Sequence, residues 1–202
     1  GVNPLYANFV PTGEYSGLMT LPRELSLCET DEGYRLKTKP FGIDEYRAGA
    51  FPIGNQKPLL TESFGLLVQG NFGRIALKNS RGEEVVIEVT VDSITVDRSK
   101  SGDLSYFDDV DPKLFKKRIC WYLQQNVTCA EMSTWRFIFD VSYLEIYADG
   151  GLETASVCVY PDAPYQVVST DGDLEVKMYN HLKNRGYVYF GRFYKNDEKK
   201  RL

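Results

Sequence analysis

Apolar and polar residues alternate one by one in short stretches along most of this chain, and turn residues interrupt them roughly every ten positions. The clearest case is residues 135–141, where one side of the alternation collects Trp135, Phe137, Phe139 and Val141. Successive side chains of a strand point to opposite faces, so this pattern indicates strands buried on one face. Many short strands separated by turns predict an all-β sandwich of two antiparallel sheets.

The same alternation of apolar and polar residues recurs in other stretches of the chain. The stretches 74–78 and 84–91 flank a loop that contains Gly82, which is typical of a hairpin, and residues 143–161 form a strand, an Asp-Gly-Gly turn and a second strand. Three further stretches also alternate apolar with polar residues, and their apolar members are Tyr34 and Leu36, Ile94 and Val96, and Leu174, Val176 and Met178.

One stretch, residues 109–126, departs from period two. Asp111 is a candidate N-cap and Pro112 suits the first helical position. Apolar residues then recur every fourth position, at Phe115, Ile119 and Leu123. This spacing predicts a short helix or a helical loop.

Composition excludes several classes of protein. The 202 residues, 43% of them hydrophobic, are enough for one domain with a core or for two small ones. The net charge of −4 argues against a nucleic-acid partner, and the basic residues of 195–202 are interrupted by Asp197 and Glu198, as in a solvated tail. No apolar run reaches the roughly 20 residues of a membrane helix, and the first residues lack the regions of a signal peptide.

The cysteines match no zinc pattern. Cys158 lies between Val157 and Val159, which predicts a buried free thiol. Cys120 and Cys129 are close enough in sequence to bridge a short loop, and whether they do is left open.

Other candidate site residues each have a plainer interpretation. The only histidine, His181, has no nucleophile motif near it, and a surface position is expected. Asn126 begins a glycosylation sequon that matters only in a secretory host. An acidic group could hold calcium but fits a solvated loop better: Asp103, Asp108, Asp109 and Asp111. A C-terminal aromatic group could stack on sugar or pack in a strand: Tyr187, Tyr189, Phe190, Phe193 and Tyr194.

Three stretches together carry a family resemblance. Thr20–Leu27, TLPRELSL, sets apolar Leu21, Leu25 and Leu27, which could face a core, around the charged Arg23 and Glu24. With the preceding residues 7–19 it resembles the segment that joins the two domains of glycoside hydrolase family 32, the invertases, sucrose-6-phosphate hydrolases, inulinases and levanases.

Two later stretches match the family in the same order. Val96–Gly102, VDRSKSG, resembles its Asp-Arg-Ser-x-Ser-Gly stretch, in which Asp97 and Arg98 are expected to form a structural ion pair or turn contact rather than a sugar contact. Residues 137–161 resemble the stretch that contains Ser-Val-Glu-Val-Phe and ends in Tyr-Pro, although Val141 replaces the family arginine and Tyr143 a small residue. The resemblance spans Tyr6 to Leu182.

The resemblance implies a division of the chain. Family members have a catalytic five-bladed propeller followed by a β-sandwich, and this chain corresponds to the sandwich without the catalytic propeller. Residues 1–18 would be an irregular linker with the last propeller strand, 19–185 the sandwich, and 186–202 an extra strand or tail. TLPRELSL would come early because most of the enzyme precedes it, and its charges would find partners at the domain boundary.

The catalytic residues of the family are absent from this sequence. The family uses aspartates in Asn-Asp-Pro and Arg-Asp-Pro settings and a Glu-Cys general acid, the carboxylates of a retaining hydrolase. None of these motifs occurs; Asp111-Pro112 follows Val110, and Cys28-Glu29 is in reverse order. We therefore expect no catalytic, cofactor-binding or metal-binding residue here, in a chain whose parent protein is a retaining glycoside hydrolase.

The function expected from the resemblance is a non-catalytic sandwich that buttresses the propeller and mediates dimerisation. The alternative is a module that binds fructan or another carbohydrate. Self-association is predicted through residues 1–20, whose apolar side chains would lack the propeller. The compartment stays open: cytoplasmic for a sucrose-6-phosphate hydrolase, secreted for a levanase or inulinase.

Overall fold

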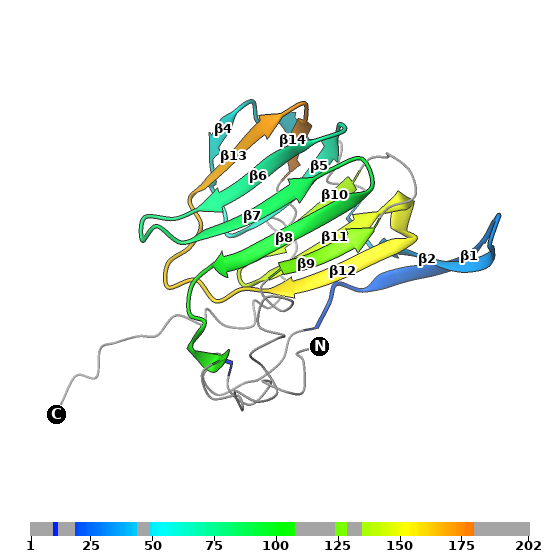
Figure 1. The fold of residues 1–202 in the computed structure, drawn as a ribbon, viewed down its shortest axis with the longest axis horizontal. Helices are drawn as coiled ribbons and strands as arrows, with labels where there is room; N and C mark the ends of the chain where they lie inside the picture. Colours follow the sequence, from blue (N-terminus) through cyan, green and yellow to red (C-terminus); the bar gives the residue numbers. More distant parts are fainter. Residues whose placement is uncertain (1–9, 12–18, 44–48, 108–123, 129–134, 180–202) are drawn as a thin grey trace.

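The fold is a sandwich of two antiparallel sheets with a β-hairpin that extends from one end (Figure 1). It is seen in a computed structural model that describes residues 10–11, 19–43, 49–107, 124–128 and 135–179. Each sheet has six strands, and every strand pair is antiparallel. The predicted fold class is therefore confirmed.

The first sheet, called the β10 sheet here, has the strand order β12-β11-β10-β5-β14-β3. Its strands are β3 (Phe51–Pro52), β5 (Ser63–Gln69), β10 (Trp135–Asp140), β11 (Tyr143–Ala148), β12 (Glu153–Cys158) and β14 (Glu175–Tyr179). A 3-10 turn, η2 (Asp149–Gly151), connects β11 to β12. The expected strand, Asp-Gly-Gly turn and strand are thus present.

The second sheet, called the β7 sheet, has the strand order β4-β13-β6-β7-β8-β9. Its strands are β4 (Gln56–Pro58), β6 (Gly73–Lys78), β7 (Glu84–Val89), β8 (Ser93–Lys100), β9 (Gln124–Thr128) and β13 (Val167–Gly172). A short 3-10 turn, η1 (Ser105–Phe107), follows β8. The hairpin predicted around Gly82 is β6–β7, and Gly82 has the positive φ of 78° that its turn requires.

The hairpin outside the sandwich consists of β1 (Arg23–Thr30) and β2 (Gly33–Pro40). Its two strands pair along their whole length, from Arg23 opposite Pro40 to Thr30 opposite Gly33. They form a separate two-stranded sheet, and the hairpin extends away from the sandwich beside β12 (Figure 1).

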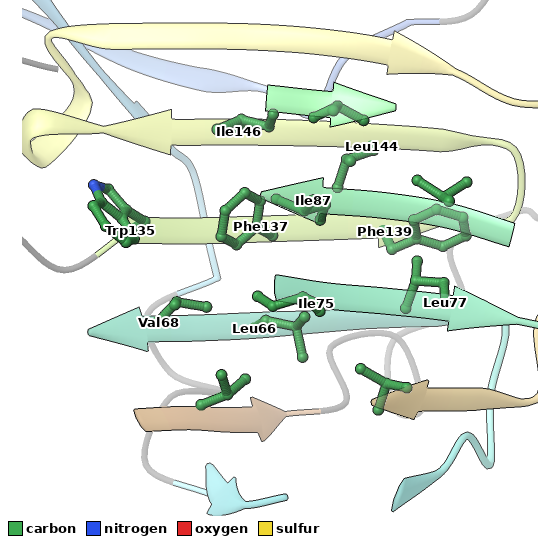
Figure 2. Close-up of a cluster of buried hydrophobic side chains, with 14 of the residues drawn as sticks. Leu66, Val68, Ile75, Leu77, Ile87, Trp135, Phe137, Phe139, Leu144 and Ile146 are labelled. Atoms are coloured by element: carbon green, nitrogen blue, oxygen red, sulfur yellow. The ribbon is translucent and has the colours of Figure 1, made fainter. Parts of the chain in front are cut away.

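Side chains from the facing surfaces of the two sheets fill the main core (Figure 2). Trp135, Phe137 and Phe139 of β10 point into it, as the alternation predicted, and Ile75 and Ile87 of the β7 sheet face them. The ring of Phe139 stacks on Phe64 at 5.4 Å between centroids and meets Tyr165 edge-on at 5.6 Å. Ile94, Val96, Val176 and Met178 also lie in this core, and Leu174 packs against it.

A smaller apolar cluster covers the outer face of the β10 sheet. It consists of Ile43, Ile138, Tyr147 and Tyr179, with Leu21, Ala50 and Leu67 packed against them. The Tyr179 ring lies directly over Gly65, where a Cβ atom would come within 2.1 Å of the ring. The β10 sheet is therefore buried on both faces near its middle, and residues from the segment around the hairpin supply part of the cover.

Some expectations differ from the structure. Val141 does not continue the inward face of β10; it begins the tight turn to β11 with a φ of 53°, because a two-residue hairpin turn needs a positive φ at this position. Cys158 is a free thiol but only partly buried, since Val157 and Val159 are the residues of that stretch that face the core. The helix expected within 109–126 falls largely outside the described residues.

None of the helices in the described part of the chain is long and apolar enough to cross a membrane.

The core assignment predicts a large loss of stability for Phe137→Ala. Phe137 is almost fully buried between the sheets, so its removal should lower the free energy of unfolding by about 3–5 kcal/mol in denaturant melts. Phe72→Ala, at an exposed turn between β5 and β6, is the control and should change it by no more than about 0.5 kcal/mol. Equal losses in the two variants would contradict this description of the core.

Candidate functional site

The charged pair within TLPRELSL is explained by a carboxylate on the sandwich. Glu145 of β11 is only 1% exposed, and it points to the outer face of the β10 sheet, away from the main core. Its Oε1 accepts a hydrogen bond from the Leu21 N–H at 2.7 Å, and its Oε2 accepts one from the Arg23 guanidinium at 2.8 Å. Arg23 thus finds a partner on the sandwich, whereas Glu24 is exposed; their expected role at a boundary between two domains stays a prediction.

Tyr147 completes this group, which we call the anchor cluster: Leu21, Arg23, Glu145 and Tyr147. The Tyr147 hydroxyl donates to Glu145 Oε2 at 2.5 Å, and the Arg23 guanidinium lies 5.4 Å from the centre of the Tyr147 ring. Burial tends to lower the pKa of Arg23, but the hydrogen bond from Arg23 to Glu145 and the nearby charges raise it overall. Burial and the hydrogen bond to Glu145 raise the pKa of Tyr147.

Three further contacts join the hairpin to the sandwich, and the first of them lies near the tip, because Arg35 belongs to the third residue pair from the turn. Arg35 pairs with Glu153 at the start of β12, and both side chains are about one-third exposed. The Thr38 hydroxyl donates to the Gly151 carbonyl at 3.2 Å. The backbones approach so closely there that a Cβ on Gly151 would lie 2.0 Å from the Thr38 carbonyl oxygen, and Gly151 also has a φ of +104°. Only glycine fits this contact between the hairpin and η2.

The hairpin also presents an exposed apolar face, defined here as Leu25, Leu27, Tyr34 and Leu36. These side chains are 60%, 73%, 75% and 52% exposed, in that order. Leu27 is directly opposite Leu36, and positions two apart share a face, so all four lie on one side of the ribbon. The idea that Leu25 and Leu27 face a core within this chain is therefore wrong, because both side chains are exposed.

The VDRSKSG stretch connects the two sheets through the buried side chain of Arg98. Arg98 is 1% exposed, and it donates to the Cys158 carbonyl at 2.5 Å and to the Tyr106 hydroxyl at 3.4 Å. Asp97 accepts a hydrogen bond from the Ser99 N–H at 2.8 Å. A turn contact was one of the two roles expected for this pair, and Asp97 makes one. The burial of Arg98 gives it a structural role.

The residues after Arg98 pack closely against the residues that follow β12. Gly102 has a φ of +135°, and a Cβ there would lie 2.1 Å from the Tyr160 carbonyl oxygen. The Asp103 N–H donates to the same oxygen at 2.7 Å, and Tyr165 donates its hydroxyl proton to the Ser101 carbonyl at 2.6 Å. Two stretches that carry the family resemblance therefore meet in space.

Most other candidate residues lie outside the described part of the chain. This holds for His181, for Cys120 and Cys129, for the C-terminal aromatic group, and for Asp108, Asp109 and Asp111. Of the acidic group only Asp103 is described, and its carboxylate accepts hydrogen bonds from the N–H and hydroxyl of Ser105. No group of three or more metal-ligating side chains is found among the residues that the structure describes. The backbone of Asn126 belongs to β9.

A comparison of this chain with known sequence families shows to which family it belongs. The family described as glycosyl hydrolases family 32 C terminal matches residues 57–183, which is more than half of the chain. This chain belongs to that family. The matched range includes both VDRSKSG and the later stretch that contains Glu145, whereas TLPRELSL precedes it. No curated protein sequence matches the chain.

Solved structures of family 32 enzymes share the fold. An exo-inulinase from Aspergillus awamori matches with a TM-score of 0.60 and 17% identity over 89% of this chain and 38% of its own. A fructofuranosidase from Schwanniomyces occidentalis, complexed with fructosylnystose, gives 0.58 and 16% over 89% and 43%. A Bombyx mori β-fructofuranosidase in complex with sucrose gives 0.55 and 20% over 82% and 33%. The chain thus spans less than half the length of each.

Glu145 is the residue of this site that sequence reasoning missed. It was recognised as part of the family stretch, but its role as the partner of Arg23 was not. The two residues are 122 positions apart. The available signal was a lone carboxylate between Leu144 and Ile146 in an apolar strand, because such a carboxylate needs a partner when it is buried.

The tight contact at Gly102 predicts that this glycine cannot be replaced. Gly102→Ala should lower the free energy of unfolding by about 2–4 kcal/mol, because the new methyl group would collide with the Tyr160 backbone. Gly82→Ala is the matched control, since Gly82 also has a positive φ but a Cβ there meets nothing within 4 Å. Denaturant melts of both variants measure the difference, and similar losses would show that backbone conformation alone is responsible.

Buried tyrosines predict a loss of stability in alkali. Burial raises the pKa of Tyr143 to about 12 and that of Tyr165 further still. The folded protein therefore favours the neutral phenol, so this stability is complete below about pH 10 and is lost as the pH rises towards 12. Each such tyrosine should lower the free energy of unfolding by at most about 1.4 kcal/mol per pH unit in that window.

Denaturant melts between pH 9 and pH 12 test this slope. Tyr143→Phe should make the decline shallower, whereas Tyr34→Phe, a change to an exposed tyrosine, should leave it unaltered. An unchanged slope in Tyr143→Phe would contradict the assignment.

Proposed function

We propose that this chain is the non-catalytic sandwich module of a β-fructosidase and that it buttresses the catalytic domain. The observation that carries the proposal is the hairpin, which is fixed to the sandwich at its base and exposes an apolar face further along. The solved relatives support it, because the chain matches less than half of each family 32 enzyme. The catalytic domain would cover Leu25, Leu27, Tyr34 and Leu36.

Two physical arguments favour such a partner. An isolated two-stranded hairpin is at best marginally stable in water, so a hairpin of this length is expected to pack against further structure. Contiguous exposed apolar side chains on one face also mark interaction sites in soluble proteins more often than isolated ones do. The anchor cluster would then hold the covered hairpin in a fixed position relative to the sandwich.

The sequence argues against chemistry in this chain itself. The family motifs that carry the nucleophile, the second aspartate and the general acid do not occur in its 202 residues. Retaining hydrolysis needs a nucleophilic carboxylate and an acid about 5 Å apart. Glu145, the buried carboxylate of the anchor cluster, is committed to Leu21, Arg23 and Tyr147 instead.

Fructan binding and dimerisation are the alternatives. Binding would depend on an aromatic platform, and the aromatic group proposed for it lies outside the described residues. Dimerisation could use the same apolar face, which a second copy would cover in place of a catalytic domain. Dimerisation differs from the main proposal in what the exposed leucines contact, so variants of these leucines separate the two, whereas carbohydrate binding is tested by a binding assay.

Substitution of the apolar face in the parent protein tests the proposal. Leu27→Asp with Leu36→Asp should lower the melting temperature of the parent enzyme, by about 2–4 °C for each 1 kcal/mol of lost contact. The same changes in the isolated chain should leave its melting temperature unchanged, because both side chains are exposed there. Val91→Asp, at an exposed apolar position between β7 and β8, is the control for the new charge.

The other possible outcomes would each contradict the proposal or favour one of the alternatives. An unaltered parent enzyme would refute the buttressing role. A dimer of the isolated chain that the two substitutions dissociate, seen by light scattering, would assign the face to self-association. Hydrolysis of sucrose, sucrose 6-phosphate, inulin or levan by the purified chain would overturn its non-catalytic role, and binding of inulin or levan without hydrolysis would favour the carbohydrate-binding module.

A further inference from the structure

The hairpin segment that binds Glu145 also covers it. Three hydrogen-bond donors of Glu145 lie among the described residues: the Tyr147 hydroxyl belongs to a sandwich strand, whereas the Leu21 N–H and the Arg23 guanidinium come from the hairpin segment. Without that segment, the carboxylate would keep only the neutral Tyr147 hydroxyl of these three. A buried charge that loses its counter-ion is strongly unfavourable, so Glu145 favours the docked position of the hairpin over any other.

The position of the hairpin segment depends in turn on Glu145. Arg23 is held by Glu145 and by a longer contact of 3.4 Å to the Ser156 hydroxyl, while its Nε has no hydrogen-bond partner among the described residues. The Leu21 amide, two residues earlier, is bound to the other oxygen of the same carboxylate. One carboxylate therefore fixes both a main-chain and a side-chain group immediately at the entry to β1.

The remaining polar contacts of the hairpin are weaker or local, and the apolar packing of Leu21 and Ile43 flanks the hairpin on either side. Arg35 and Glu153 are both partly exposed, and exposed ion pairs contribute little. The hydrogen bond from the Phe41 N–H to the Pro22 carbonyl joins the two ends of the hairpin to each other, not to the sandwich. Thr38 meets η2 through one hydroxyl contact and one close backbone approach.

We propose that Glu145 is a positioning residue that sets the direction in which the β1–β2 hairpin leaves the sandwich. The sandwich core does not need it, because Leu144 and Ile146, its neighbours on β11, supply the contacts to the main core. When its charge is removed, the hairpin swings about its base while the two sheets stay folded. In the parent protein this would loosen the angle between the two domains, a consequence that rests on the proposed function.

A distance measurement on the chain itself tests the positioning role. Spin labels carried by unnatural amino acids at Glu32, in the hairpin turn, and at Arg81, in the β6–β7 loop, leave the native cysteines in place. The native chain should give one narrow distance in pulsed electron resonance. Glu145→Gln should replace it with a broad distribution, while near-ultraviolet circular dichroism still reports a packed sandwich.

A matched control and a second variant make the result decisive. Glu153→Gln neutralises the other carboxylate that pairs with the hairpin and should keep the narrow distance. Arg23→Met breaks the anchor from the hairpin side and should broaden the distribution, even if Glu145→Gln fails to fold. A narrow distance in Arg23→Met, or equal broadening in Glu153→Gln, overturns the proposal. Because the measurement is made on this chain alone, neither result depends on the buttressing role.

Discussion

Strand β11 is buried on both of its faces, and the rest of the molecule is arranged around that constraint. Leu144 and Ile146 face the β7 sheet across the main core, whereas Glu145 and Tyr147 face outward beneath the hairpin segment. A strand covered on one side only could tolerate a solvated carboxylate at position 145. Here the carboxylate must be satisfied by protein groups, and two of the groups that satisfy it, the Leu21 N–H and the Arg23 guanidinium, begin the hairpin.

The two arginines that stand in family motifs have the same kind of role. Arg98 reaches the Cys158 carbonyl, and Arg23 reaches Glu145, so each joins segments that are far apart in the chain. A guanidinium carries several donors on a long stem, which suits it to link strands whose backbones cannot approach directly. In this chain, both arginines therefore have a structural role, because each joins distant segments of the fold.

Period two predicted the inward residues well, because the alternation at Phe137, Ile94 or Val176 is imposed by the core itself. It failed at Val141, since alternation does not reveal where a strand gives way to a tight turn. The same alternation gave a wrong prediction at Leu25 and Leu27. Their spacing is that of a buried face, but both side chains are exposed on the hairpin. The partner of Arg23 depends on tertiary structure, which no local pattern contains.

Under the proposed function a partner covers the apolar face, and the size of this face bears on which partner that is. Four side chains on a ribbon of two eight-residue strands form a small surface, and stable contacts between separate proteins usually bury more than about 1,000 Å². A partner in the same polypeptide needs much less, because the connecting chain holds it at an effective concentration in the millimolar range. The hairpin is therefore better suited to a covalently linked domain than to a second copy. The anchor at Glu145 adds to this advantage, since a ribbon held in one direction loses less conformational freedom on contact than a mobile one.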